Sequence, residues 1–333
     1  MRSLPCYHPL FGYPAGISRE TGKMQYHIVP ASDPRVNDPY WKDQLIQIPC
    51  GKCIGCRLEY SRQWANRCML ELQYHDSAYF VTLTYNEEHV PRDGIYMSMS
   101  LRKRDFQLFM KRLRKKYSDD RIRFYACGEY GSETFRPHYH AILFGLHLDD
   151  LELYKSKDSY KYFTSPGLQR VWSVLELGKD GITPLAQPLG YVVVAPVTWE
   201  TCAYTARYTS KKANTQSPEF FEKFGIESPF TLMSRKPGIG RDYYDDHPDV
   251  YQHEFINVST KNGGKKFRPP RYFDRLLEQD DPELFAQLKE QRKERAKETQ
   301  QAKAAKSTMS FMQALEVAES NKLASTKKLK REL

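Results

Sequence analysis

The stretch Arg136-Pro-His-Tyr-His-Ala-Ile-Leu-Phe-Gly145 has the pattern of a β-strand, because its apolar and aromatic residues run up to a glycine. Successive side chains of a strand point to opposite faces, so His138 and His140 share one face about 7 Å apart. Two imidazoles at this spacing can bind one divalent cation. The alternative is a purely structural role for both, since His-x-His triplets are common.

Glu129 favours the metal-binding interpretation. Residues 121–127 form the preceding predicted strand, and a turn near residues 133–134 would bring Glu129 opposite His138. Two imidazoles and one carboxylate leave coordination positions open, as a catalytic metal site requires. Oxygen donors from phosphate and water favour Mg²⁺ or Mn²⁺ in those positions. Glu133 is the alternative third ligand, but its expected place in the turn makes it the weaker candidate.

The spacing of apolar residues predicts an α+β fold. The expected strands are 78–85, 121–127, 139–145 and 191–197, and the expected helices are 57–75, 101–117, 167–177 and 198–213, with Ser100 as the N-cap of the second. From residue 78 onward this order predicts a mostly antiparallel sheet covered by helices, of the ferredoxin-like kind. We expect four segments, namely a Cys-rich N-terminal region (1–75), the sheet domain (76–214), a C-terminal extension (215–281) and a basic, helical or partly disordered tail (282–333).

Length and composition exclude several classes of protein. The 333 residues contain no apolar run near the roughly 18 residues that a membrane span needs, and no N-terminal signal peptide is visible. We therefore expect a soluble, unexported protein without a membrane partner. Seven cysteines, an odd number, indicate metal ligation or free thiols rather than a disulfide framework.

The net charge of +10 is concentrated in two segments. Residues 101–116 carry +7 and residues 291–333 carry +6, so the remainder is slightly acidic. This pattern indicates a polyanionic partner, with the helix expected to contact DNA near the metal site and the tail to add salt-sensitive grip. The candidate DNA-binding residues are Arg102, Lys103, Arg104, Lys111, Arg112, Arg114, Lys115, Lys116 and Arg136.

Three cysteines lie at C-x₂-C-x₂-C spacing, namely Cys50, Cys53 and Cys56. This spacing is typical of structural zinc sites, with Cys6 as the preferred fourth ligand and His8 or Cys68 as alternatives. The other interpretation is a group of free thiols in a small hydrophobic pocket.

Tyr204, Tyr208, Lys211 and Lys212 are expected to share one helix face. Most such stripes belong to a core, but the lysines on this one favour chemistry. Tyrosine is a weak nucleophile at its free pKa of about 10. A metal that holds a phosphate and an ammonium that favours phenolate would together activate it.

Three ordered motifs resemble those of HUH endonucleases: the strand Phe80-Val-Thr-Leu-Thr-Tyr85, the triplet His138-Tyr139-His140, and the helix with Tyr204 and Tyr208. The sequence resembles more closely the rolling-circle replication initiators of gokushovirus-like Microviridae, which are small single-stranded-DNA phages. Supporting local features are Cys6-Tyr-His-Pro-Leu10, Pro49-Cys-Gly-Lys-Cys-Ile-Gly-Cys-Arg57, Ser61-Arg-Gln-Trp-Ala65 and Gly128-Glu-Tyr-Gly131. Tyr139 departs from the bulky aliphatic residue that is usual at the middle position.

The resemblance implies a two-tyrosine nickase that cuts one strand at the phage origin. His138, His140 and Glu129 would hold a metal on the scissile phosphate, while one tyrosine forms a 5′-phosphotyrosine and leaves a free 3′-OH. The second tyrosine would later cut the regenerated origin, and rejoining would release circular single-stranded DNA. The implied partners are origin DNA and the host replication helicase and polymerase, in the cytoplasm of the infected bacterium. The alternatives are a non-enzymatic DNA-binding or packaging protein, or an HUH enzyme of plasmid, relaxase or transposase type.

Overall fold

The computed structural model describes residues 5–41, 44–157, 160–178, 182–212, 218–260, 263–305 and 308–327. Contacts divide the chain into two compact units. We call residues 60–274 the sheet unit, and residues 5–59 together with 275–327 the terminal unit. The four segments expected from the sequence stay a prediction.

A seven-stranded antiparallel sheet organises the sheet unit, in the order β14-β7-β8-β4-β13-β10-β9. Its four central strands were expected from the sequence: β4 (Ala78–Thr84), β7 (Arg123–Tyr130), β8 (Pro137–Phe144) and β13 (Val192–Pro196). The other three were not: β9 (Glu152–Lys157), β10 (Tyr160–Thr164) and β14 (Phe230–Met233). The prediction of a mixed fold with a large antiparallel sheet is confirmed.

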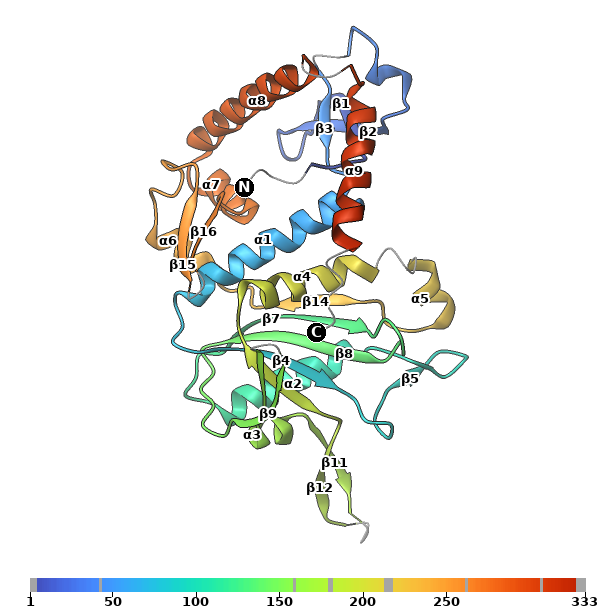
Figure 1. Cartoon of the computed structure of the whole chain (residues 1–333), viewed down its shortest axis with the longest axis vertical. Coiled ribbons are helices and arrows are strands. Elements are labelled where there is room, and N and C mark those ends of the chain that lie inside the picture. Colours follow the sequence, from blue (N-terminus) through green and yellow to red (C-terminus); the bar gives the residue numbers. More distant parts are fainter. Residues whose placement is uncertain are drawn as a thin grey trace. The chain divides into compact units, whose positions relative to one another are not determined.

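Helices cover both faces of this sheet (Figure 1). One face packs against α1 (Ile54–Leu72) and α4 (Trp199–Lys212), through small buried residues such as Ala65 and Ala206. The opposite face packs against α2 (Lys103–Lys116) and α3 (Pro166–Val171). The apolar stripe of α2 is buried as its periodicity predicts, and each such side chain contributes about 1.5–3 kcal/mol of transfer free energy.

Two local predictions are wrong. Helix α2 begins at Lys103 with Arg102 as N-cap, because Ser100 instead donates its hydroxyl to the carbonyl of Leu101 and accepts from the backbone N–H of Glu227. The helix expected over residues 167–177 ends at Val171. Residues after it form β11 (Ser173–Leu177), which pairs with β12 (Pro184–Pro188) in a hairpin that no helical pattern reveals.

The remaining elements of the sheet unit are short. They are the hairpins β5 (Arg92–Asp93) with β6 (Ser98–Met99) and β15 (Ile256–Thr260) with β16 (Gly263–Phe267), and the helices α5 (Pro218–Phe224) and α6 (Arg241–Asp246). Helix α7 (Arg271–Asp280) begins in this unit and ends in the terminal unit.

The terminal unit contains a three-stranded sheet and two longer helices. The sheet has the order β2-β1-β3 and consists of β1 (Leu10–Ile17), β2 (Met24–Pro30) and β3 (Ile46–Ile48), with the 3₁₀ turn η1 (Pro34–Val36) after β2. The C-terminal helices are α8 (Pro282–Ala304) and α9 (Phe311–Lys327), which confirms the expected helical C-terminal part. Among the described helices, none combines the length and apolarity needed to cross a membrane.

A buried ion pair fixes α1 to β7 within the sheet unit. The carboxylate of Glu71, which is 1% exposed, accepts hydrogen bonds from Arg123, from His75 at 3.2 Å and from the backbone N–H of Gly240 at 2.7 Å. Burial by itself raises the pKa of Glu71, but the hydrogen bonds from His75, Arg123 and Gly240 outweigh it and lower the pKa below its ordinary value. The carboxylate is therefore charged and stabilising at neutral pH.

Replacing Glu71 with glutamine should destabilise the protein by roughly 3–5 kcal/mol, because the charge of Arg123 would stay buried without its partner. A lowered pKa also means that this stabilisation is complete above the ordinary glutamate pKa of about 4.3 and is lost as the pH falls below it. Urea unfolding of wild type and Glu71→Gln between pH 7 and 3 measures both effects. Equal midpoints for the two proteins at pH 7 would contradict the role of this pair, and exposed Glu88→Gln serves as the control.

Candidate functional site

The pairing register of β7 and β8 brings an acid beside the two histidines. Glu129 pairs directly with His138, as the sequence predicts. Its Oε1 atom lies 2.8 Å from Nε2 of His138 and 3.1 Å from Nε2 of His140. The ligand atoms of the three residues all lie within 4.8 Å of one another. Glu133, the alternative ligand, is exposed in the turn and does not join this group, which we call the His–Glu cluster.

Neighbouring groups orient both imidazoles toward the carboxylate. His138 Nδ1 lies 3.1 Å from the carbonyl of Arg136, which can only accept, so Nδ1 carries the proton. His140 Nδ1 lies 2.9 Å from Thr82 Oγ1, and its ring stacks on Phe80 with centroids 5.3 Å apart. Partners of this kind fix the tautomer and direction of metal-binding histidines. The Nε2 atoms of both rings therefore converge on Glu129.

The charges of the cluster fit a bound cation. Glu129 is 1% exposed, and its Oε2 atom has no hydrogen-bond partner among the described residues. Burial raises the pKa of Glu129, but hydrogen bonds from His138 and His140 outweigh it and hold the pKa below its ordinary value. Burial lowers the pKa of His140, which favours the neutral imidazole. A lone pair on Nε2 that faces a carboxylate oxygen is stabilised by a positive charge between them, and a divalent cation supplies one.

Helix α4 brings Tyr204 to the same cluster. The rings of Tyr204 and His140 meet edge to face with centroids 5.2 Å apart, and Tyr204 also contacts Phe80 at 6.1 Å. The helix is anchored by buried Ala203, whose carbonyl accepts a 2.6 Å hydrogen bond from Ser61. The side chains of Tyr208, Lys211 and Lys212 lie outside the described part of the structure, although their backbone continues α4.

The basic helix α2 lies on the opposite face of the sheet. Its Phe106 packs against Tyr139 with ring centroids 5.8 Å apart, and Tyr139 points away from the face that carries His138 and His140. The expectation that this helix lies near the metal site is therefore wrong. The sequence reveals the charge of the helix, but which face it covers depends on packing.

Some of the expected DNA-binding cations have structural partners. Arg102 pairs with Asp93 at 2.9 Å, and Arg112 and Arg114 donate to backbone carbonyls of the same unit. The exposed cations of α2 and its N-cap are Arg102, Lys103, Arg104, Lys111, Arg114, Lys115 and Lys116. Arg136 lies two residues before His138, where it donates to the carbonyl of Tyr85 at 3.0 Å and pairs with Glu87. DNA binding by all of these residues stays a prediction.

Tyr139 has a structural role that explains its size. Its hydroxyl donates to the carbonyl of Arg102 at 2.8 Å and accepts from the backbone N–H of Arg102 at 3.1 Å. It also lies 2.7 Å from the hydroxyl of Tyr85. The unusual middle residue of the triplet thus fixes the start of α2 from beneath the sheet and does not disturb the His–Glu cluster.

Sequence reasoning missed Thr82 and Phe80 as residues that support the site. Both belong to β4, which pairs with β8 so that Thr82 lies opposite His140 and Phe80 opposite Ile142. Their signal was present in the alternation of the strand, but it becomes useful only when the pairing partner of β4 is known.

The four expected cysteines of the terminal unit also come together. The sulfurs of Cys6, Cys50, Cys53 and Cys56 lie within 4.8 Å of one another, and we call this group the tetracysteine cluster. Of the candidates for the fourth ligand, the structure brings Cys6 to the other three. His8 instead lies 2.6 Å from Glu319, and the Cys68 thiol is hydrogen-bonded to Cys202 in the core of the sheet unit.

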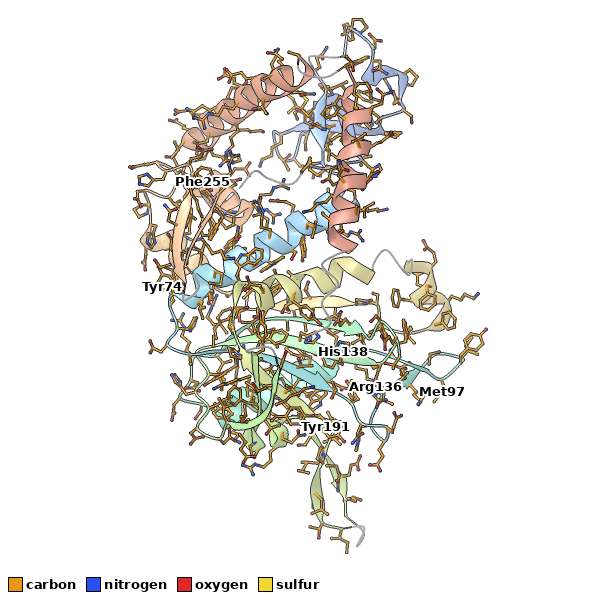
Figure 2. The ribbon with its side chains drawn as sticks, in the orientation of Figure 1. Tyr74, Met97, Arg136, His138, Tyr191 and Phe255 are labelled. Atoms are coloured by element: carbon orange, nitrogen blue, oxygen red, sulfur yellow. The ribbon has the colours of Figure 1, made fainter. Side chains whose placement is uncertain are left out.

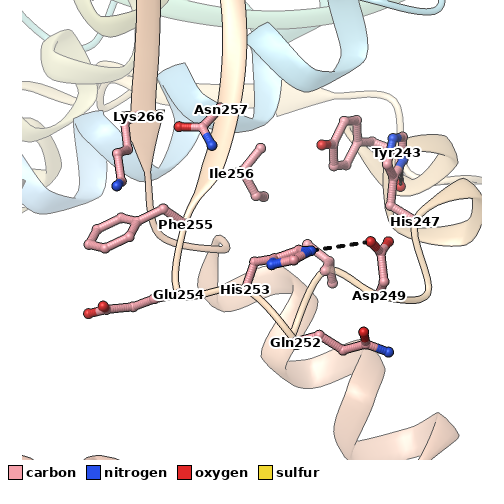
Figure 3. A pocket seen from close by; sticks show the side chains of 11 residues that line it. Tyr243, His247, Asp249, Gln252, His253, Glu254, Phe255, Ile256, Asn257 and Lys266 are labelled. Atoms are coloured by element: carbon pink, nitrogen blue, oxygen red, sulfur yellow. Dashed lines mark hydrogen bonds and ion pairs between the residues drawn. The ribbon is translucent and has the colours of Figure 1, made fainter.

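A separate cavity of about 510 Å³ lies beside α6 and the β15–β16 hairpin (Figure 3). Its lining includes Asp249 and His253, which form an ion pair at 3.6 Å, and Lys266. Among the described residues it contains no group of three metal-ligating side chains. The His–Glu cluster, with a tyrosine beside it, is therefore the better candidate for catalysis.

Comparison with known proteins relates the chain to phage replication. Residues 78–213 match the family model of the replication-associated protein ORF2. The chain is 33% identical over 261 residues to replication-associated protein ORF2 of Spiroplasma virus 4, covering 76% of this chain and 75% of the relative. It is 28% identical over 263 residues to replication-associated protein VP4 of Bdellovibrio phage phiMH2K, covering 75% and 74%. No solved structure matches the chain.

Proposed function

Because the chain belongs to the family of phage replication-associated proteins, we propose that it initiates rolling-circle replication by nicking the origin strand through tyrosine transesterification. The observation that carries the proposal is the position of Tyr204 against His140 of the His–Glu cluster. A phenol beside a site suited to a cation is the arrangement needed to attack a phosphate that the cation neutralises.

The proposed nick exchanges one phosphoester for another. The oxygen of Tyr204 or Tyr208 attacks phosphorus as its phenol proton leaves, and the bond from phosphorus to the 3′ oxygen breaks. The 3′ oxygen takes up a proton and becomes a free 3′-OH that a polymerase can extend, while the 5′ end stays attached as phosphotyrosine. Lys211 and Lys212 follow on the same helix, where an ammonium would favour the phenolate. The phosphotyrosine keeps the energy of the cut bond, so rejoining needs no ATP.

Two tyrosines allow the cycle to close without releasing the DNA. After one circuit the second tyrosine cuts the regenerated origin, and the new 3′-OH attacks the first phosphotyrosine. This step joins the ends and releases circular single-stranded DNA. Tyr204 and Tyr208 are four residues apart on α4, so they lie one turn apart on one helix face.

The residues of the His–Glu cluster would hold Mg²⁺ or Mn²⁺, since both accept a mixed donor set and keep positions for phosphate and water. Such an ion would polarise the scissile phosphate. Zinc is the proposed ion of the tetracysteine cluster. The roles of the basic residues of α2 and of Arg136 in binding single-stranded DNA are part of the same proposal.

The topology supports a ferredoxin-like, HUH-type catalytic domain. The central strands have the spatial order β7-β8-β4-β13, and α2 and α3 connect them in the β-α-β-β-α-β sequence of a split βαβ unit. We propose residues 76–214 as this domain, flanked by the Cys-rich region 1–75, the extension 215–281 and the basic tail 282–333. The proposed setting is the cytoplasm of an infected bacterium, with origin DNA, host helicase and host polymerase as partners.

The decisive experiment incubates the purified protein with phage-origin single strands and Mg²⁺ or Mn²⁺. We expect a covalent protein–DNA product that depends on the metal and a free 3′-OH on the released fragment. Mapping of the linked peptide should identify residue 204 or 208. Tight DNA binding without any covalent product would favour a non-enzymatic binding or packaging protein instead.

A further inference from the structure

The tetracysteine cluster has the surroundings of a thiolate metal site. Backbone N–H groups point at three of the sulfurs: Cys50 N–H at Cys6 Sγ (3.2 Å), Cys53 N–H at Cys50 Sγ (3.4 Å), and Tyr7 N–H at Cys53 Sγ (3.3 Å). Donors in these positions stabilise negative sulfur. All four cysteines are free of disulfides. Cys6 and Cys50 are 44 residues apart in sequence, so the convergence of their segments needs a common partner.

The C-terminal helix α9 packs directly on this cluster. Leu315 of α9 is 8% exposed and forms one hydrophobic group with Tyr7 and Cys53, which are 4% and 7% exposed. Met312 and Ala318, one turn to either side of Leu315, pack against the same group. His8, two residues after Cys6, lies 2.6 Å from Glu319. Each contact of α9 with this region involves a ligand cysteine or its close neighbours.

Helix α9 has little else to hold it in place. Its 17 residues are near the length at which an isolated helix is only marginally stable in water. Val317 and Leu323 on its other sides are exposed. Leu315 is the buried apolar anchor of the described helix. The order of α9 therefore depends on the shape of the loop that carries the cysteines.

We infer that the tetracysteine cluster binds one zinc ion and that the metal-bound loop is the docking site of α9. Zinc binding would displace the thiol protons and fix four sulfurs in a tetrahedron, which holds residues 5–8 against residues 50–56. Tyr7 and Cys53 then present the apolar surface that receives Leu315. Metal binding at one end of the sequence would thus order a helix at the other end.

Zinc content and hydrogen exchange of the full-length protein test this inference. Wild type should contain one zinc per chain, and its removal by a chelator should raise amide exchange in residues 311–327 at least about tenfold, with recovery when zinc is returned. Unchanged exchange after complete removal, or wild type without zinc, would overturn it.

Two variants separate the metal from the dock. Leu315→Asp should keep its zinc yet lose protection in α9, whereas Cys53→Ser should lose both. Leu323→Asp, an exposed change on the same helix, should match wild type. A Leu315→Asp protein with fully protected α9 would show that the helix is held by something other than the cysteine loop.

A second inference comes from the pairing register of the large sheet. Tyr191, Thr84, His138 and Glu129 form one row across β13, β4, β8 and β7, because Thr84 pairs with His138 and its backbone N–H donates to the carbonyl of Tyr191 at 3.0 Å. Gly190 permits this approach, since a Cβ atom there would lie 2.0 Å from the carbonyl oxygen of Thr84.

Tyr191 belongs to the face of the His–Glu cluster. Its neighbours Val192 and Val194 are buried in the core on the α2 side, so strand alternation directs Tyr191 to the other side. Its ring is 70% exposed, and Figure 2 labels it with His138 and Arg136 at the same end of the sheet. Two strand spacings separate it from His138, about 10 Å, which is close to the reach of the next nucleotide.

We propose that Tyr191 stacks on an unpaired base beside the scissile phosphate and so positions the strand; this rests on the proposed nicking function. Aromatic stacking contributes to single-strand binding whatever the base. The test uses a Tyr204→Phe/Tyr208→Phe background, in which binding is measured without cleavage. Tyr191→Ala should weaken oligonucleotide binding roughly 5- to 100-fold, Tyr191→Phe should restore it, and Tyr154→Ala, exposed on edge strand β9, should have no effect.

The covalent-product assay distinguishes the two possible failures. If wild type forms adducts but Tyr191→Ala binds as tightly as its parent, the stacking role is wrong and the nicking function stands. If wild type forms no adduct under any metal condition, the nicking function itself is wrong.

Discussion

A protein with both Tyr204→Phe and Tyr208→Phe should form covalent adducts with origin DNA at least roughly 10⁴-fold more slowly than wild type, because no phenolic oxygen is left on α4 to attack phosphorus. The ring of phenylalanine preserves the edge-to-face contact that Tyr204 makes with His140. Folding and metal binding should therefore be unchanged. Denaturing gel analysis of labelled origin strands after a timed reaction measures the rate directly.

The single variants should separate the steps of the cycle. With one tyrosine left, a first nick is still possible, but the second cleavage that releases a circle is not. We therefore expect adducts without closed circles from at least one single variant. Tyr154→Phe, an exposed substitution on β9, is the matched control. Adducts of the double variant at the wild-type rate would rule out α4 as the source of the nucleophile.

The sequence was sufficient to predict those parts of the site that depend on local spacing. His138 and His140 share a face because strands alternate, and Glu129 reaches them because the turn between β7 and β8 is short. The same reasoning placed Tyr204 and Tyr208 on one helix. Similarly, the close spacing of three cysteines indicated a cluster, and Cys6 proved to be its fourth member.

What the sequence could not provide depends on long-range packing. The charge of α2 is visible in its residues, but its position opposite the His–Glu cluster follows from how Phe106 packs under Tyr139. The edge strands β9, β10 and β14 were missed since edge strands lack the continuous apolar pattern of the centre. The supporting role of Thr82 required knowledge that β4 pairs with β8.

Glu129→Gln should weaken Mn²⁺ binding by at least about 100-fold, a larger loss than the roughly 10- to 100-fold typical of an outer partner. Glutamine keeps the size of the side chain but removes the negative charge that two converging imidazoles and a divalent ion require. Thr82→Ala should show the smaller loss, since Thr82 acts only through His140. Calorimetric titration of the metal-free protein compares the variants.

Glu133→Gln provides the matched control, because it removes the same charge from an exposed turn four residues away. We expect it to bind Mn²⁺ as wild type does, which would assign the acidic ligand to the strand and not to the turn. Equal losses in Glu129→Gln and Glu133→Gln would instead mean that the general negative potential of this end of the sheet attracts the ion. Only a loss confined to Glu129, accompanied by loss of the covalent DNA product, joins metal binding to the attack by tyrosine.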